Sequence, residues 1–480
     1  MNRDLGALTA REHDVLVVGG GVSGAAIAWD AALRGLRVAL VDAADFAAGT
    51  SWNSLKTIHG GLRHLQRANL AAVRASARER SAFLRIAPAL VRPLPFLVPT
   101  YGHGLRGREA LRIALLASDA LTADRNRGLD PAHAIPRGRV LSAGETRALL
   151  PGLDPHRLTG GARWSDAQVT SSERLVLAFA HSAAAEGAAV ANYVAVSTLT
   201  RDGSGRITGA DCRDALGGGA LTVRARVTVN AAGPGIDSVL AASGVRALPV
   251  PLLRAFNVVL RRCVVPDVAV AGHAGGRFLF LVPWRDRTIV GTGYEDPEAP
   301  AGGARGFLDE AARAFPWAGI GPEDATLVHE GLVPGSGDAG GLWMSERVRD
   351  HARDGAPGLI SALGVKFTGA RALAEAAVDA ALRALGRARV AARTDWIALR
   401  REAPAVGSLA DAARAAVRDE MAVHLTDAVL RRLDLGTAGP PAPGDVTAVL
   451  AAMAAALGWG EARRGEERAA LDSFYAARRL

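Results

Sequence analysis

The first part of the chain combines short apolar runs with one glycine-rich turn and one helical stretch. Residues 15–18 are all apolar, which predicts a buried parallel strand. After the glycine-rich turn, residues 25–34 predict a helix, and residues 37–41 predict a second apolar strand that ends at Asp42. This order of strand, glycine turn, helix and strand is typical of a nucleotide-binding βαβ unit.

The glycine turn has the GxGxxG spacing, with glycines at Gly19, Gly21 and Gly24. The first glycine permits the tight turn, the second lets the backbone approach a pyrophosphate, and the third allows the helix to pack closely on the strand. Asp42 comes 18 residues after Gly24, where it is placed to accept hydrogen bonds from a ribose hydroxyl. The pattern therefore predicts dinucleotide binding by this turn, with Val22 and Ser23 included, and it leaves FAD and NAD as alternatives.

Farther along the chain, the periodicity of the apolar residues changes from segment to segment. Residues 171–187 predict a helix, 188–199 and 207–211 predict strands, and 246–340 alternate strands with turns. Residues 66–160 predict mostly helical excursions. From Trp396 onward the period is helical, with a proline- and glycine-rich linker expected over 435–444.

Composition narrows the function classes. The 480 residues are 49% hydrophobic and 22% charged, and no apolar run reaches the ~18–20 residues of a membrane-spanning helix. The opening residues carry no apolar signal region, so we expect a cytoplasmic location. Cys212 and Cys263 form no CxxC pair, which argues against a disulfide scaffold, and we expect no metal site.

The net charge of +9 comes almost entirely from arginine, since Lys56 and Lys366 are the only lysines. The arginines are spread along the chain and aromatic residues make up 5%, so we expect no nucleic-acid partner. Arginine and lysine are not interchangeable where a compact ammonium is needed, which makes the two lysines candidates for function.

Residues 45–65 are too polar and glycine-rich for a core segment, and they read DFAAGTSWNSLKTIHGGLRHL. This stretch resembles the FAD-dependent glycerol-3-phosphate dehydrogenases, members of the D-amino-acid-oxidase-like flavoproteins, whose pattern is F-A-x-G-T-S followed by K-L-I-H-G-G-L-R-Y-L. The resemblance continues in order through 229–234, 278–284, 358–368 and the helical C-terminal part, so it covers nearly the whole chain. It implies FAD as the cofactor and a place in glycerol metabolism.

The resemblance also implies a fold class and domain limits. We predict an α/β (α+β overall) protein with a Rossmann-like FAD-binding domain, an interleaved β-sheet substrate domain and a helical C-terminal domain. The expected limits are 1–65, 165–240 and 345–390 for the FAD-binding domain, 66–164 and 241–344 for the substrate or cap domain, and 396–480 for the helical domain.

Several segments are implied to bind the flavin besides the glycine turn and Asp42. The residues are Thr50, Ser51, Ser54, Lys56, Ile58, His59, Gly60, Val194, Ala232, Gly233, Gly364, Lys366, Phe367 and Thr368.

The implied reaction is oxidation of a secondary alcohol by hydride transfer to the flavin, from sn-glycerol 3-phosphate to dihydroxyacetone phosphate or on a related polyol phosphate. Arg63 and Arg349 would hold the anionic group, and Lys366 would lie by the flavin pyrimidine or the developing charge. The base is expected among the histidines. His64 is favoured over His59 and His351 because it adjoins Arg63 and replaces the tyrosine of the family pattern.

Other positions depart from the family pattern. The arginine of G-[VL]-R-P is Val333, a family histidine is Asn257, and G-T-T-D becomes the sequence at 291–294. Losing one arginine removes a charge-assisted contact of ~1.5–3 kcal/mol. An amine, amino-acid or alcohol oxidase of the same fold that uses O2 therefore stays an alternative, as does a flavin-bound scaffold without turnover.

The partners remain open at this stage. The resemblance allows quinone or O2 as the electron acceptor, and a homodimer. Residues 105–127 combine arginines with apolar residues in one helical stretch. That pattern fits a peripheral contact with the inner face of the cell membrane, or an ordinary amphipathic helix packed on the core.

Overall fold

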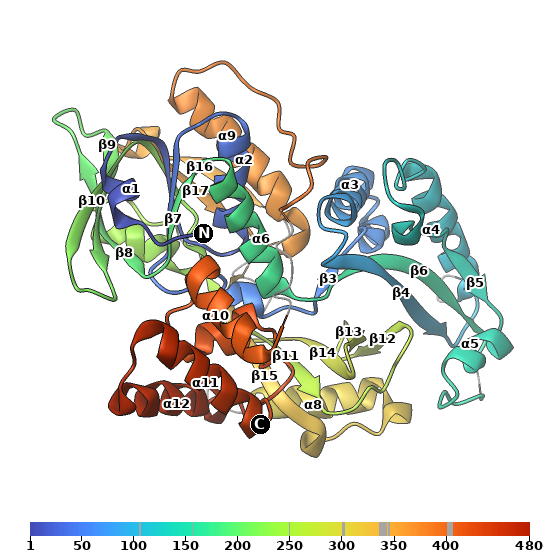
Figure 1. Ribbon diagram of the computed structural model, residues 1–480. Coiled ribbons are helices and arrows are strands. Elements are labelled where there is room, and N and C mark those ends of the chain that lie inside the picture. Colours follow the sequence, from blue (N-terminus) through green and yellow to red (C-terminus); the bar gives the residue numbers. More distant parts are fainter. Residues whose placement is uncertain are drawn as a thin grey trace. The chain divides into compact units, whose positions relative to one another are not determined.

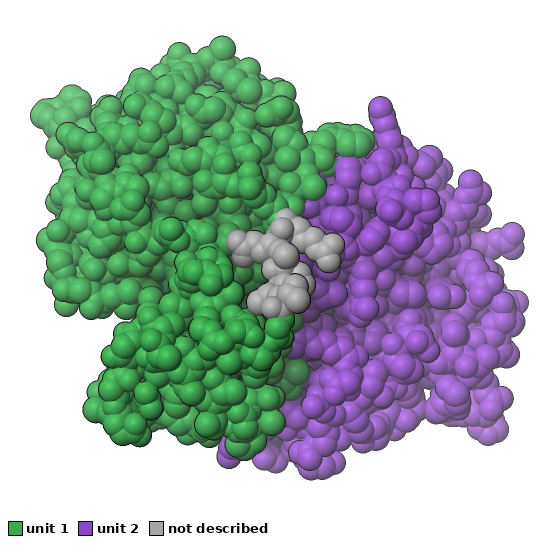
Figure 2. Space-filling model, viewed as in Figure 1, with its two compact units in different colours: residues 1–52, 171–254, 331–477 green, residues 53–170, 255–330, 478–480 purple. Residues whose placement is uncertain are grey.

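The computed structural model describes residues 1–104, 107–156, 158–248, 250–299, 303–335, 343, 346–400 and 407–480 (Figure 1). The chain divides into two compact units, which Figure 2 colours green and purple. Unit 1 comprises Met1–Trp52, Ser171–Arg254 and Gly331–Ala477, and unit 2 comprises Asn53–Thr170, Ala255–Glu330 and Arg478–Leu480. The α/β fold class is confirmed, and the three-domain division stays a prediction.

Unit 1 is built on a sheet with the strand order β16-β17-β10-β1-β2-β7. Strands β1, β2, β7, β10 and β17 are parallel, and β16 joins β17 antiparallel. A β8–β9 hairpin extends β10. The bounds are β1 His13–Val18, β2 Val38–Val41, β7 Ala189–Ala191, β8 Val194–Arg201, β9 Ile207–Asp214, β10 Ala220–Asn230, β16 Arg347–Asp350 and β17 Leu359–Leu363.

Helix α2 (Val22–Leu33) follows β1 and packs against α6 (Ser172–Ala185) and α9 (Ala370–Ala384), as Figure 1 shows. Its alanine-rich sequence allows this close packing, and nine of its 12 residues are buried. The predicted βαβ unit is therefore confirmed, with the helix beginning three residues earlier than expected. Two short helices complete this part: α1 (Leu5–Thr9) and α7 (Ile236–Ala242).

Unit 2 contains most of the second sheet, whose order is β15-β11-β14-β13-β12-β4-β6-β3, with β5 paired to β6. Its apolar core includes Leu97, Val258, Leu281 and Phe315, all almost fully buried. The strands are β3 Thr57–Ile58, β4 Val91–Thr100, β5 Arg139–Leu141, β6 Gly160–Val169, β11 Leu252–Leu260, β12 Ala269–Ala274, β13 Arg277–Trp284, β14 Arg287–Glu295 and β15 Ala325–Pro334. The helices are α3 Leu70–Ile86, α4 Arg108–Leu121, α5 Ala143–Leu149 and α8 Gly303–Ala314.

The expectation of mostly helical structure over 66–160 is wrong in part, because β4 and β5 lie in this range. Strand β4 contains Pro93, Pro95 and Pro99, and prolines normally argue against a strand. Alternate residues present their N–H groups to the same strand edge, so all three missing donors belong to one edge. Strand β4 still pairs with β6 along its whole length, whereas its pairing with β12 involves only Phe96 and Leu97.

The C-terminal part of unit 1 is helical, as predicted. It contains α10 (Leu409–Glu420), a π-helical turn η10 (Asp427–Arg432), α11 (Pro443–Leu457) and α12 (Glu461–Ala476). The segment expected to be a plain linker is instead packed in place. The Tyr475 hydroxyl of α12 donates to the Gly436 carbonyl at 3.1 Å, and Thr437 is fully buried.

Within the described ranges, no helix is both long enough and apolar enough to cross a membrane. The predicted amphipathic stretch is α4, on which Ile113 and Leu116 are 70% and 62% exposed and Leu115 is buried. Leu105 and Arg106, at the beginning of the expected stretch, lie outside the described residues.

Candidate functional site

The glycine turn between β1 and α2 can be formed only by glycines. Gly19 has a φ of +104°, and a Cβ there would lie 2.6 Å from the Ala231 carbonyl oxygen. A Cβ on Gly24 would lie 1.7 Å from the Gly19 carbonyl oxygen. The turn therefore packs its backbone against the strand ends, as the dinucleotide pattern requires.

Gly21 marks the open side of this turn. Apart from the two adjoining residues, the one described atom within 4 Å of a Cβ built there is Ser51 Oγ, at 2.9 Å. The same Ser51 Oγ accepts a hydrogen bond from Val22 N at 2.9 Å, and the neighbouring Thr50 hydroxyl donates to the Leu332 carbonyl at 2.7 Å. Ser51 is thus brought to the N-terminus of α2, with Thr50 next to it, and their contact with the flavin stays a prediction.

Asp42 closes the other side of the turn. Its Oδ2 accepts from Gly20 N at 2.5 Å and its Oδ1 accepts from Ala44 N at 2.8 Å. The pKa of Asp42 is raised to about 6, mainly by burial and in smaller part by the Asp45 carboxylate, while the Ala44 and Gly20 N–H groups and the Arg431 charge oppose the rise. Val194 N donates to the Asp42 carbonyl at 2.7 Å, so these two predicted site residues are also adjacent.

The carboxyl ends of β10 and β17 supply the remaining unit 1 segments. Ala232 and Gly233 follow β10, beside Gly19, and Gly364 follows β17. A Cβ on Gly364 would lie 3.1 Å from Ser23 Oγ, which places this glycine at the start of α2. The remaining predicted residues continue from there into η9 (Phe367–Gly369) and α9, and they are Lys366, Phe367 and Thr368.

These observations test whether a dinucleotide fits. The carboxyl ends of β1, β2, β10 and β17 meet at one edge of a parallel sheet, which is where such folds bind ligands. The first turn of α2 has no acidic residue, and its positive dipole end favours a pyrophosphate. The space beside Gly21 is one that a side chain would fill. The residues therefore fit a dinucleotide.

Lys56 belongs to unit 2 and is 1% exposed with a φ of +55°. Its Nζ lies 5.3 Å from the Trp284 ring centroid, a cation–π distance, and its carbonyl accepts from Val169 N at 2.7 Å. Ser54 Oγ accepts from Lys56 N at 3.1 Å, and Ile58 is fully buried in β3. This ammonium is thus held beside an aromatic ring.

His59 is paired with a buried carboxylate that the sequence analysis did not single out. His59 Nδ1 lies 3.0 Å from Asp166 Oδ2, and Asp166 Oδ1 accepts from Gly60 N at 2.7 Å and Arg80 Nη1 at 3.3 Å. Burial alone would raise the pKa of Asp166, but the His59 hydrogen bond and the Arg80 charge outweigh it and the pKa is lowered. The signal that could have identified Asp166 is an acidic residue inside strand β6, most of whose residues are buried.

Arg63 and His64 lie in η2 (Leu62–Arg67) of unit 2. Arg63 is exposed, and together with Arg277 it acts electrostatically on Tyr294, whose pKa burial raises. His64 is half-buried, and its carbonyl accepts from Asn69 N at 3.1 Å.

Arg349 belongs to unit 1, and its guanidinium is already bound. Its Nε and Nη2 donate to Asp354 at 3.0 and 2.6 Å. The neighbouring His351 is fully buried, with Nδ1 2.9 Å from Asp354 and Nε2 2.9 Å from Ser361 Oγ. His351 is therefore buried between Asp354 and Ser361, which favours a structural role for this histidine.

Two departures from the family pattern lie together in unit 2. Asn257 Nδ2 donates to Asn53 Oδ1 at 2.7 Å, and Asn257 Oδ1 accepts from the Thr292 hydroxyl at 2.9 Å. Asn53 Nδ2 in turn donates to the Ala255 carbonyl at 2.8 Å. The position where a histidine was expected is thus part of a neutral chain of hydrogen bonds. In unit 1, Val333 is 9% exposed within β15.

Comparisons with known proteins agree with this geometry. A family model described as FAD dependent oxidoreductase (DAO) matches residues 14–380. The glycerol-3-phosphate dehydrogenase of Synechocystis sp. is 32% identical over 391 residues, covering 76% of this chain and 69% of that protein. Glycerol-3-phosphate dehydrogenase 2 of Mycobacterium tuberculosis is 36% identical over 391 residues, covering 78% of this chain and 64% of that protein. The chain therefore spans about two thirds of the length of these curated relatives.

Solved structures share the fold. The glycerol-3-phosphate dehydrogenase from Bacillus halodurans, complexed with FAD, has a TM-score of 0.73 at 22% identity and covers 98% of this chain and 96% of its own. The L-α-glycerophosphate oxidase from Mycoplasma pneumoniae, with FAD bound, has a TM-score of 0.57 at 17% identity, covering 80% of this chain and 97% of its own. On the family match and the sequence identities together, the chain belongs to the FAD-dependent oxidoreductase family, whose cofactor is FAD.

Proposed function

We propose that the chain oxidises sn-glycerol 3-phosphate to dihydroxyacetone phosphate with FAD as the redox cofactor. The observation that carries this proposal is the 32–36% identity, over about three quarters of the chain, to proteins named glycerol-3-phosphate dehydrogenase. When bound, FAD accepts the hydride from the substrate carbon. The protein must then bind the anion, orient the alcohol and take its proton.

We assign to His59 the role of the base that takes the hydroxyl proton of the substrate, and its contact with Asp166 supports this assignment. When Nδ1–H donates to Asp166, Nε2 carries the lone pair that can accept the hydroxyl proton. The buried Asp166 carboxylate then stabilises the imidazolium that forms, as in other carboxylate–histidine pairs. The imidazole is 42% exposed, so a substrate can reach part of the ring. His64 remains the second candidate for the base.

Arg63 is our first candidate for the substrate phosphate, because it is an exposed guanidinium in the segment that also contains His59. Arg349 is the second candidate, and it would have to share its donors with Asp354. Lys366 is assigned to the negative charge that develops on reduction, because an ammonium next to that charge would stabilise it.

Anaerobic bleaching of the flavin absorbance tests the proposal. sn-Glycerol 3-phosphate should bleach the bound flavin, whereas glycerol, which lacks the phosphate, should bleach it poorly. Bleaching by glycine or L-proline but not by sn-glycerol 3-phosphate would replace the proposal with the amine-oxidising alternative.

Val333 offers a test of the substrate within the same class. If a larger polyol phosphate is the native substrate, Val333→Arg should raise kcat/KM for sn-glycerol 3-phosphate by at most ~100-fold, the size of one charge-assisted contact. A wild type already efficient on sn-glycerol 3-phosphate and damaged by the substitution leaves sn-glycerol 3-phosphate itself as the substrate.

For the electron acceptor we propose a membrane quinone, reached by peripheral contact through α4. Ile113 and Leu116 are exposed on this helix, and Arg108 and Arg112 can face anionic headgroups. In liposome flotation the wild type should float with anionic vesicles and the Ile113→Ser/Leu116→Ser variant should not. Failure of the wild type to float at low salt, together with peroxide formation in air, would favour O2 as the acceptor.

A further inference from the structure

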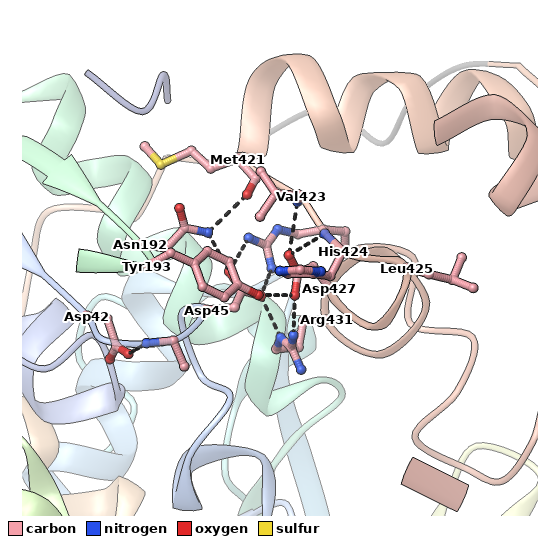
Figure 3. A network of polar contacts seen from close by, with 12 residues as sticks. Asp42, Asp45, Asn192, Tyr193, Met421, Val423, His424, Leu425, Asp427 and Arg431 are labelled. Carbon is pink, nitrogen blue, oxygen red and sulfur yellow. Dashed lines mark hydrogen bonds and ion pairs between the residues drawn. The ribbon is translucent and has the colours of Figure 1, made fainter. Parts of the chain in front are cut away.

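A buried network joins the loop after β2 to the C-terminal part of unit 1 (Figure 3). At its centre is the fully buried Asp45 carboxylate. Arg431 Nε donates to Asp45 Oδ2 at 2.5 Å, and Arg432 donates to both carboxylate oxygens at 2.6 and 2.7 Å. Asn192 Nδ2 adds a fourth donor at 2.9 Å. The two arginines lie 386 and 387 residues after Asp45 in the chain.

The arginines are themselves held by the C-terminal segment. Arg431 Nη2 donates to Asp427 Oδ1 at 2.6 Å, and the Tyr193 hydroxyl donates to the same oxygen at 2.7 Å. Asp427 Oδ2 accepts from the backbone N–H groups of Val423 and His424, which fixes the start of η10 (Figure 3). Asp45, Asp427, Arg431 and Arg432 thus balance two negative charges with two positive ones in a buried place.

The loop that Asp45 belongs to rests directly on the glycine turn. Asp42 accepts from Gly20 N, and Ala47 N donates to the Gly20 carbonyl at 3.2 Å. The Phe46 ring lies so close beneath Gly20 that a Cβ there would approach it to 2.3 Å. Asp45 therefore links the loop that contacts the glycine turn to the two arginines of the C-terminal segment.

The C-terminal arginines lie outside residues 14–380, which the family model matches. We propose that Arg431 is a positioning residue for the cofactor, holding the 42–47 loop, through Asp45, in the place where Asp42 meets the ribose. This inference rests on the cofactor site described above. It assigns to the C-terminal helices a role in cofactor affinity.

The charge of Arg431 gives the proposal a specific signature. Two charged groups act on Asp42: Asp45, from its own loop, raises the pKa, and Arg431, from the C-terminal segment, lowers it. A ribose hydroxyl donates best to the ionised carboxylate, so FAD affinity should fall as the pH drops through about 6, the pKa of Asp42. Removing either partner should move this midpoint, in opposite directions.

The experiment is FAD titration of the full-length apoprotein between pH 5 and 8, followed by flavin fluorescence. Arg431→Met should weaken FAD binding about tenfold at pH 8, the size of one charge-assisted hydrogen bond, and should move the midpoint to higher pH. Asp45→Asn should also weaken binding at pH 8 but move the midpoint to lower pH. Arg431→Lys keeps the charge, so it should restore the midpoint and only part of the affinity.

Arg468→Met is the matched control, because Arg468 lies in the same C-terminal segment and pairs with the exposed Asp472 at 3.2 Å. It should leave both affinity and midpoint unchanged. The proposal is overturned if Arg431→Met binds FAD like the wild type, or if its affinity falls without any shift of the midpoint. If Arg431→Met does not fold, Asp45→Asn and Arg431→Lys decide instead: the midpoint of Asp45→Asn should move to lower pH, whereas that of Arg431→Lys should stay at the wild-type value, and equal midpoints would overturn the proposal.

The outcome is separable from that of the cofactor site itself. A wild-type apoprotein that binds no FAD would defeat the site assignment. A wild type that binds FAD, with variants that neither lose affinity nor shift the midpoint, would defeat only the role of Arg431.

Discussion

Two buried carboxylates, one in each unit, are held in similar ways and differ in what they hold. Asp45 in unit 1 and Asp166 in unit 2 each accept several hydrogen bonds, and each has a lowered pKa because the hydrogen-bond donors and positive charges around it outweigh burial. The partners of Asp45 are arginines with 10% and 0% exposed side chains, whereas Asp166 holds His59, which is 42% exposed. The Asp45 contacts restrain the backbone, and the Asp166 contact holds a ring that is partly exposed.

The difference shows how burial of the partner decides the role of a carboxylate. A carboxylate that binds only buried arginines can restrain backbone and little else, because no ligand reaches the charges. A carboxylate behind a half-exposed imidazole fixes its tautomer and orients a ring that a substrate can reach. We therefore expect changes at the two sites to separate cofactor binding and stability from turnover.

The largest effect, on flavin content, should come from a substitution in the glycine turn of unit 1. In Gly21→Val the Cβ would already lie 2.9 Å from Ser51 Oγ, and the added methyl groups would occupy the space next to the α2 N-terminus. The purified variant should contain almost no flavin, as measured by its absorbance, while its circular dichroism stays that of a folded protein. Gly49→Ala is the control, since a Cβ there has no described atom within 4 Å. Stoichiometric flavin in Gly21→Val would show that the turn does not bind FAD.

The next largest effect, on the rate of turnover, should come from a substitution of His59 in unit 2. His59→Asn should lower the rate of flavin reduction by sn-glycerol 3-phosphate ~10²–10⁴-fold, the range for loss of a general base. His103→Asn, an exposed histidine near Glu109, should change the rate little. Flavin content separates this role from the cofactor contact that the family resemblance implies for His59. A larger loss in His64→Asn than in His59→Asn would reverse the assignment of the base.

Removing the Asp45 carboxylate should lower the stability of the fold rather than the rate of turnover. Asp45→Ala leaves Arg431 and Arg432 buried without their carboxylate, so it should lower the free energy of unfolding by ~3–5 kcal/mol in urea denaturation. Asp472→Ala removes an exposed carboxylate paired with Arg468 and should cost less than ~1 kcal/mol. Equal effects of the two substitutions would mean that the Asp45 network contributes no more than a surface ion pair.

The smallest effect concerns acid stability. The folded-state pKa of Asp45 lies below its unfolded value of ~3.9, so its contribution is fully present above about pH 4 and is lost as the pH falls through the folded pKa. The free energy of unfolding of Asp45→Asn should therefore fall less steeply below pH 4 than that of the wild type, by at most ~1.4 kcal/mol per pH unit. Parallel slopes for the two proteins would indicate that Asp45 already titrates in the native state as it does when unfolded.

Local signals predicted much of the fold and part of the site. The βαβ unit and Asp42 follow from apolar runs and glycine spacing within about 30 residues, and the structure has them where they were expected. Strand β4 was missed because its three prolines hide a strand whose ladder to β6 they leave intact. Asp166 was missed because its partner His59 lies 107 residues away, and no spacing within either segment indicates the pair.

By itself the sequence predicted that this chain binds a dinucleotide, because the order of strand, glycine turn, helix and strand and the spacing of the glycines are local along the chain. Only the tertiary structure decided which charges meet. It placed Arg431 on Asp45 and Asp166 behind His59, across 386 and 107 residues. The reason is physical: a buried charge needs a partner in space, and a fold of parallel strands and crossovers brings partners together without regard to their distance along the chain.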